Sequence, residues 1–335
     1  MKKFINEPNQ FVDDTISGIV SAHPDQVKLL EENNRVLLRA QEKSQNKVGI
    51  VTAGGSGHLP LFLGYVGEGM LDGCAIGNVF ASPSADSMAQ MIRACDKGAG
   101  VICLFGNYGG DKMNFQMACD EVEFDDIETR LVIAGDDIAS SPKGKEDKRR
   151  GVAGIVFAYK IAGAAAERGD NLDEVVRVAN KVLDGTRTMG FATSPCIIPE
   201  VGAPSFQIAD DEIEVGMGIH GEPGIEVKKM MTANEVADLA VNAILDDLNF
   251  SGEGKFSVLI NGLGATPLEE QYIVYNRVSE LLKEKGIEVK YPHIGEFATS
   301  MEMAGLSITL LELDDELEEL LSAIAKTPFY TNYNI

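Results

Sequence analysis

Histidine is scarce in this sequence, so each of the four can be weighed as a candidate for chemistry. His58 closes a glycine- and serine-rich run directly after an apolar segment, and His220 lies in a run with glycines on both sides. Glycines let the backbone approach a ligand closely and expose its amide groups, and imidazole is a competent nucleophile near neutral pH. His58 and His220 are therefore candidate site residues, although residue type alone leaves a structural role open for both. His23 and His293 flank prolines and are expected to be surface or capping residues.

Glycine-rich turns often bind phosphate, but the turns of this sequence lack the spacing of nucleotide loops. The run from Gly54 to His58 has no Lys-Ser/Thr ending of the GxxxxGK[ST] type and does not fit GxGxxG. A second glycine-rich turn, at residues 106–111, ends in Asp111. Asp111 is either a turn residue or a carboxylate at the edge of a ligand site.

Short β-rich segments alternate with helical patterns along the chain. This alternation predicts two α/β domains with mostly parallel or mixed sheets. In open sheets of this kind ligands bind at the carboxyl ends of the strands, so we expect the site at that edge, between the domains. Predicted strands cover residues 47–53, 100–105, 130–134, 256–260 and 287–291, with a further apolar run at 306–311. Predicted helices cover residues 84–97, 152–168, 172–183, 232–248 and 268–285.

A length of 335 residues suits two hydrophobic cores better than one. A proline- and glycine-rich passage at residues 195–204 separates the two halves of the chain. We therefore expect an N-terminal domain at residues 1–190, with the turns of His58 and Asp111. The C-terminal domain, residues 191–335, would hold the loop of His220.

Composition excludes several classes of partner. The formal charge of −23 argues against nucleic acid and anionic membranes. No apolar run approaches the ~20 residues that span a bilayer, and the N-terminal lysines are not followed by the apolar segment of a signal peptide. The five cysteines are scattered and never spaced as CxxC, which argues against disulfides and zinc. We expect a cytoplasmic protein without a metal.

Several segments together resemble one family, the dihydroxyacetone-binding (K) subunit of dihydroxyacetone kinase. The segments fall in the family's order along nearly the whole chain, and those around His220 and Gly262 are the most specific. They are Gly54–His58, Phe80–Pro83, Asn107–Phe115, Arg149–Gly154, Gly163–Glu167, Gly218–Gly224, Gly262–Leu268 and Ser307–Leu310.

The resemblance implies catalytic roles for three side chains. His220 would form a hemiaminal with the ketone carbon of the substrate, and His58 and Asp111 would lie beside the hydroxyl to be phosphorylated. The substrate would also be contacted by Gly55, Ser56, Gly57, Ser82 and Gly106.

The resemblance also implies partners. This chain would bind no cofactor itself, because the nucleotide and Mg²⁺ would belong to a separate L subunit. A phosphotransferase-system-type M subunit could pass phosphoryl groups to the L subunit. The chain itself would be a homodimer. The ligand would be a small ketose.

Two positions depart from the family pattern at the site. Leu59 stands where the family usually has glutamate, and Gly106 stands where it usually has a lysine that touches the substrate. The loop at residues 135–150 also departs from the usual form. A missing lysine predicts a roomier, less polar pocket edge, so erythrulose competes with dihydroxyacetone as the expected substrate. A ketose-sensing coactivator without kinase activity is the alternative function.

Overall fold

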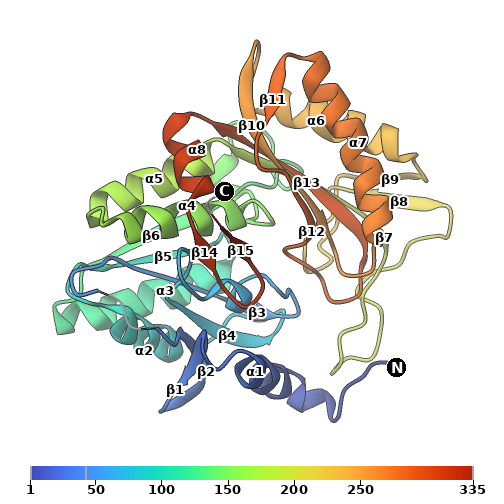
Figure 1. Ribbon diagram of the computed structural model, residues 1–335. Coiled ribbons are helices and arrows are strands. Elements are labelled where there is room, and N and C mark those ends of the chain that lie inside the picture. The colour runs from blue at the N-terminus through green and yellow to red at the C-terminus, as the bar shows by residue number, and fades with distance from the viewer. Residues whose placement is uncertain (1, 42–43, 334–335) are drawn as a thin grey trace.

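The computed structural model describes residues 2–41 and 44–333, and its strands form two large sheets (Figure 1). The six-stranded first sheet has the order β1-β2-β4-β3-β5-β6, in which β4, β3, β5 and β6 run parallel. Its strands are β1 (Val27–Leu30), β2 (Asn33–Arg39), β3 (Gly49–Ser56), β4 (Gly73–Val79), β5 (Val101–Gly106) and β6 (Thr129–Ala134).

Helices cover both faces of the first sheet, with α2 and α3 on one face and α4 and α5 on the other (Figure 1). Every residue of β3 and β5 is consequently buried, which is why these strands are nearly continuous apolar or glycine runs. The helices of this half are α1 (Phe11–Ala22), α2 (Ala85–Cys95), α3 (Gly109–Val122), α4 (Ile155–Arg168) and α5 (Leu172–Asp184).

The seven-stranded second sheet is mixed, with the order β11-β10-β13-β7-β8-β9 and with β12 also paired to β10. The strands from β10 to β9 alternate in direction, and only β11 and β12 run parallel to β10. They are β7 (Thr186–Ser194), β8 (Glu212–Val215), β9 (Glu226–Lys229), β10 (Gly254–Gly262), β11 (Ile287–Val289), β12 (His293–Glu296) and β13 (Ala304–Leu313).

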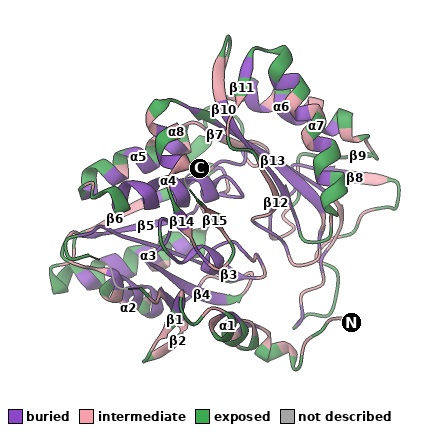
Figure 2. Cartoon of the chain, in the orientation of Figure 1, coloured by how far each residue is buried: buried purple, intermediate pink, exposed green. Residues whose placement is uncertain are grey.

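Helices α6 (Ala233–Asp247) and α7 (Leu268–Glu284) cover the outer face of the second sheet, whereas α4, α5 and α8 (Asp315–Ser322) lie between the two sheets (Figure 1). One hydrophobic core is therefore shared by both halves. Figure 2 shows buried residues in the strands of both sheets and in α4 and α5. A two-stranded ribbon, β14 (Ala325–Lys326) and β15 (Thr331–Asn332), ends the described chain.

The predicted α/β class, with one largely parallel and one mixed sheet, is confirmed, and the predicted elements match within a few residues. One local prediction was wrong: residues 106–111 are not a turn throughout, because α3 already begins at Gly109 and places Asp111 in its first helical turn. The division of the chain at residue 190 stays a prediction, and that position lies within β7. Within residues 2–41 and 44–333, no helix is long and apolar enough to cross a membrane.

Candidate functional site

The candidate site lies where the parallel strands of the first sheet end. β3 leads into His58, β4 into Phe80 and Ser82, and β5 into Tyr108 and the start of α3. Parallel strands bring these carboxyl ends to one edge of the sheet. The second half of the molecule contributes the loop at residues 216–224, which joins β8 to β9 and carries His220. The predicted place of the site, at this edge and between the two halves, agrees with the structure.

His58 is a buried, neutral histidine with one free ring nitrogen. Its Nδ1 lies 2.7 Å from the carbonyl oxygen of Thr299, which can only accept, so Nδ1 carries the proton. Burial, assisted by the charge of His220, lowers the pKa of His58 to about 3. Its Nε2 therefore holds a lone pair, and this buried atom has no hydrogen-bond partner within the described chain.

His220 is held differently, by a carboxylate. Its Nδ1 lies 2.8 Å from Glu222 Oε1, and its backbone N–H donates to Glu222 Oε2 at 2.9 Å. Burial favours the neutral acid, but the hydrogen bond and charge of His220 outweigh it and lower the pKa of Glu222 to about 2. A carboxylate only accepts, so Nδ1 is the protonated nitrogen. In the neutral imidazole of His220 the lone pair is therefore on Nε2.

The two histidine rings lie in an aromatic enclosure. The ring centroids are 4.7 Å apart, and the ring planes are nearly perpendicular. The Phe80 ring stacks on His58 at 4.9 Å, and the Tyr108 ring meets His220 edge-on at 4.8 Å. Phe80 has a φ of 57°, which non-glycine residues adopt at a cost of about 1–3 kcal/mol. This strained residue supports the ring of His58.

Asp111 is a buried carboxyl group without a full set of partners. It is 5% exposed, and its Oδ1 has no hydrogen-bond partner among the described residues. Burial raises the pKa of Asp111 to about 6, while a hydrogen bond from Ser82 and the charge of His220 act in the opposite direction. A carboxyl group with a pKa near neutrality is suited to accept a proton during a reaction.

The glycines of the His58 loop allow close packing of neighbouring loops. A Cβ on Gly55 would lie 2.7 Å from the Ala81 amide nitrogen, and one on Gly57, whose φ is 101°, would lie 2.7 Å from the Phe80 ring. The Ser56 hydroxyl donates to the Gly77 carbonyl at 2.8 Å. These contacts position the site, and the expected contacts of Gly55, Ser56 and Gly57 with a substrate stay predictions.

The two departures from the family pattern have different surroundings. A Cβ on Gly106 would lie 3.0 Å from the Tyr108 ring, so this ring already occupies part of the space that the missing lysine was expected to leave open. Leu59 lines a largely apolar cavity of about 460 Å³ beneath the N-terminal segment, with Leu63 and Met301 among its neighbours.

Other predicted residues fall outside the site. His23 caps the end of α1, as expected of a capping residue. The expectation for His293 was wrong, because its Nε2 lies 2.9 Å from the Tyr330 hydroxyl and its ring packs between Phe157, Phe297 and Tyr330. Within the described chain, no cluster of three histidine, cysteine, aspartate or glutamate side chains could hold a metal ion.

The sequence assigned no role to three residues that complete the site. Glu222 could have been found, because a carboxylate two residues after a loop histidine can reach its ring. Tyr108 lay within a segment that resembles the family but carried no signal of its position. Thr299 acts through its backbone carbonyl, for which residue type gives no indication.

Fold and site together define a two-domain α/β protein with two imidazoles and a carboxyl group at the strand ends of its first sheet. Residues 17–329 match the model of the Dak1 domain family. The chain belongs to this family, that of the DhaK dihydroxyacetone-binding subunits.

Two relatives show the range of the family. The chain is 46% identical, over 316 residues, to the dihydroxyacetone-binding subunit DhaK of PTS-dependent dihydroxyacetone kinase 1 from Listeria innocua, covering 94% of this chain and 95% of the relative. It is 42% identical to L-erythrulose 1-kinase from Mycolicibacterium smegmatis, covering 98% of this chain but 58% of that longer protein.

A solved structure is similar over almost the whole chain. The dihydroxyacetone kinase operon co-activator Dha-DhaQ superposes with a TM-score of 0.89 at 31% identity, covering 98% of this chain and 100% of the co-activator. The family therefore has this fold in proteins whose names describe kinase subunits and in one named as a co-activator.

Proposed function

We propose that this chain is the ketose-binding subunit of a dihydroxyacetone-type kinase. The observation that carries the proposal is a pair of buried polar atoms without partners in the described chain, His58 Nε2 and Asp111 Oδ1, next to a histidine whose Nε2 is available. Buried polar atoms are nearly always hydrogen-bonded, so these two unpaired atoms, both on residues that interact with His220, support a ligand that completes them. A ketose offers hydroxyl groups to both atoms and a carbonyl carbon to His220.

The first step is reversible addition of His220 to the ketone. The Nε2 lone pair forms a bond to the carbonyl carbon, the π pair of the C=O bond moves to its oxygen, and that oxygen takes up a proton. The ring becomes cationic and faces the Glu222 carboxylate, which lies 2.8 Å from Nδ1. Loss of the Nδ1 proton then gives a neutral hemiaminal, so one proton is gained and one is released.

The second step is phosphoryl transfer to a hydroxyl of the bound ketose: its oxygen bonds to the phosphorus of the donor's terminal phosphoryl group as the bond from that phosphorus to the leaving nucleoside diphosphate breaks. Asp111 accepts the hydroxyl proton on its unpaired Oδ1, and His58 Nε2 accepts a hydrogen bond that orients the ligand. Positioning and charge stabilisation supply most of the catalysis in such reactions. The donor would be a nucleotide with Mg²⁺ on an L-type partner subunit, recharged where present by an M-type subunit, and the chain would act as a homodimer.

The substrate is dihydroxyacetone or a close relative such as erythrulose. Both are named in relatives that are more than 40% identical. Gly106 and the adjacent Tyr108 ring set the edge of the pocket that has to accept the fourth carbon. The absence of a side chain at Gly106 supports a site that accepts both ketoses, with the tetrulose placing its extra carbon beside this glycine.

A ketose-sensing coactivator is the second candidate, because Dha-DhaQ shares the fold over its whole length. Retention of Asp111 as a buried carboxyl group with an unpaired oxygen favours the kinase subunit, since sensing a ketone needs no base for a hydroxyl.

Reconstitution tests the proposal. The purified chain is mixed with an L-type subunit carrying nucleotide and Mg²⁺, and phosphate transfer is measured for dihydroxyacetone and for both enantiomers of erythrulose. The proposal predicts transfer that depends on both proteins. Covalent ketose binding without transfer would support the coactivator instead, and robust transfer by the isolated chain would overturn the division of labour.

A further inference from the structure

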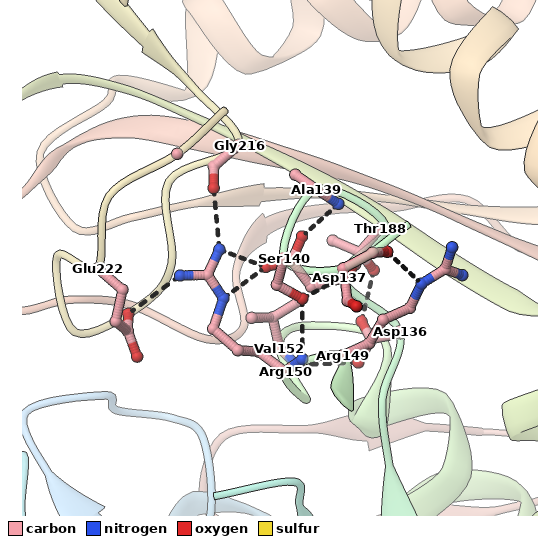
Figure 3. Close-up of polar contacts among 12 residues, drawn as sticks. Asp136, Asp137, Ala139, Ser140, Arg149, Arg150, Val152, Thr188, Gly216 and Glu222 are labelled. Carbon is pink, nitrogen blue, oxygen red and sulfur yellow. Dashed lines mark hydrogen bonds and ion pairs between the residues drawn. The ribbon is translucent and has the colours of Figure 1, made fainter. Parts of the chain in front are cut away.

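Arg150 lies between Asp137 of the first half of the molecule and Gly216 and Glu222 of the second (Figure 3). Its Nε and Nη2 contact Asp137 Oδ2 at 2.9 and 2.8 Å. Nη2 also donates to the Gly216 carbonyl at 3.0 Å, and Nη1 lies 3.8 Å from Glu222 Oε2. One guanidinium thus contacts a carboxylate of the first half and both ends of the loop that carries His220.

The first half of the molecule holds this arginine firmly. Asp137, 2% exposed, follows β6, and its Oδ1 accepts from the Ala139 amide at 3.0 Å. The backbone of Arg150 is fixed as well, because its N–H donates to the Ser140 hydroxyl at 2.9 Å and its carbonyl accepts from the Asp137 amide at 3.1 Å. The Arg150 side chain, 14% exposed, therefore projects from a rigid base.

The Arg150 and Glu222 side chains pack closely against Gly218. A Cβ on Gly218 would lie 2.6 Å from Arg150 Nη1 and closer still to Glu222 Oε2. The position does not have a positive φ, so alanine is allowed by the backbone, but its methyl group would force the ends of the Arg150 and Glu222 side chains to shift. Glycine at this position keeps the arginine and the carboxylate in place.

We infer that Arg150 is a positioning residue for the ketone-binding histidine: anchored by Asp137, it holds Glu222 and the 216–224 loop so that His220 presents Nε2 to the ligand. The inference rests on the proposed function. Glu222 uses both oxygens on His220, one on the ring and one on the backbone, so the orientation of this carboxylate decides which ring nitrogen is free. Arg150 is the cation beside it and the link to the first half.

Four variants of the full chain separate this role from general stability. Arg150→Met removes the guanidinium and keeps an apolar stem, and Arg150→Lys keeps a cation without the planar fork. Gly218→Ala places a methyl group against the ends of Arg150 and Glu222 and removes no side chain of the Arg150–Asp137 pair. Arg187→Met is the matched control, because Arg187, on β7, contacts Asp247 at 2.7 Å and its hydrogen bonds and ion pairs within the described chain do not reach the His220 loop.

Two NMR measurements report on the site without turnover. With dihydroxyacetone labelled with ¹³C at the ketone carbon, adduct formation moves the signal from the carbonyl region to that of tetrahedral carbon. With ¹⁵N-labelled histidine, the free protein shows which nitrogen of His220 carries the proton. Thermal unfolding of each variant gives the loss of stability for comparison.

The wild type and Arg187→Met should form the adduct with equal affinity and show a protonated Nδ1. Arg150→Met and Gly218→Ala should weaken adduct formation by about tenfold to 100-fold and give mixed protonation of the ring, because small misplacements of a reacting group cost this much. Arg150→Lys should fall between.

Wild-type affinity and wild-type ¹⁵N signals in both Arg150→Met and Gly218→Ala would overturn the inference. If Arg150→Met does not fold, Gly218→Ala decides alone. Absence of the tetrahedral signal in the wild type is a different result, which would refute the covalent step of the proposed function.

Discussion

The two histidines of the site lie with their rings 4.7 Å apart, yet different kinds of structure prepare them. His58 is 1% exposed, follows a fully buried strand and is tied to a backbone carbonyl. The His220 side chain is 21% exposed, lies in an irregular loop and is tied to a carboxylate. Burial prepares His58 in the first region, and a charged partner prepares His220 in the second.

Under the proposed function, this difference gives separate tasks to the two halves of the site. Burial keeps His58 neutral and leaves Asp111 with a raised pKa, which suits handling a proton during phosphoryl transfer. The charges around His220 fix its protonated nitrogen, which suits holding the ketone. Changes in the first region should therefore reduce transfer, and changes in the second should reduce binding.

The largest expected effect is on transfer, in Asp111→Asn. Removing the base should reduce phosphoryl transfer by about 100-fold to 10,000-fold and leave the adduct with His220 detectable. Transfer is measured with the L-type partner, and adduct formation by ketose binding. The control is Asp120→Asn, which changes an exposed carboxylate on the same helix. Near-normal transfer in Asp111→Asn would make Asp111 a structural residue.

The same variant should be more stable than the wild type at alkaline pH. A carboxyl group whose pKa is raised on folding to about 6 destabilises the fold once it is ionised, so stability is lost as pH rises through that pKa. The amide that Asp111→Asn introduces does not ionise, so the variant would avoid this loss, which is on the order of 1–3 kcal/mol. Thermal unfolding should show a higher Tm for the variant at pH 8 and little difference at pH 4.

A smaller effect, on ketose binding rather than on transfer, is expected for Glu222→Gln in the second region. The amide no longer fixes Nδ1 as the protonated nitrogen, so ketose binding should weaken by about tenfold to 100-fold while transfer from the bound state changes less. KM and kcat measured separately distinguish the two. Glu226→Gln, an exposed change beyond the same loop, is the control. A loss confined to kcat would contradict the assignment of tasks.

The pH profile of kcat/KM should have an acid limb that falls tenfold per unit below about pH 6, where Asp111 becomes protonated. His58, with its pKa lowered to about 3, should not contribute between pH 5 and 8. Asp137 has a pKa of about 6 as well, raised by burial and lowered in part by Arg150. Protonation of Asp137 would weaken its contact with Arg150. An acid limb in the pH profile of ketose binding, without one in transfer, would therefore indicate Asp137.

The smallest expected effect concerns substrate choice, in Gly106→Lys. The new side chain should fill the pocket edge and shift the ratio of kcat/KM values towards dihydroxyacetone over erythrulose by about tenfold. Gly106→Ala is the matched control, because it displaces the Tyr108 ring by its Cβ without adding a cation. A clear preference for dihydroxyacetone in the wild type, unchanged in Gly106→Lys, would end this idea.

Much of the fold could be predicted because its signals are local. The buried strands β3 and β5 and the glycine-rich turns after them are visible in the sequence, as are the helices α2, α4, α5, α6 and α7. Helix α3 was missed altogether, because it begins on Gly109 and Gly110, which look like turn residues. The mixed second sheet pairs strands far apart in sequence, which no local pattern reports.

The site was predictable in its side chains and less so in their connections. Resemblance to the family indicated His58, Asp111 and His220. The structure brings His58 and His220 together and places Asp111 where His220 affects its pKa. The link from Glu222 through Arg150 to Asp137 depends on tertiary contacts. The space beside Gly106 was overestimated because the ring that fills part of it lies two residues further along the chain.

The most direct test of the central claim is a crystal of the wild-type protein soaked with dihydroxyacetone, with His220→Ala as the comparison. The account predicts continuous density from His220 Nε2 to a tetrahedral carbon of the ligand, with ligand hydroxyls within hydrogen-bond distance of His58 Nε2 and Asp111 Oδ1, and no ordered ligand in the variant. A fully occupied, unbonded ketose in the wild type, or a bond at Nδ1, would contradict it.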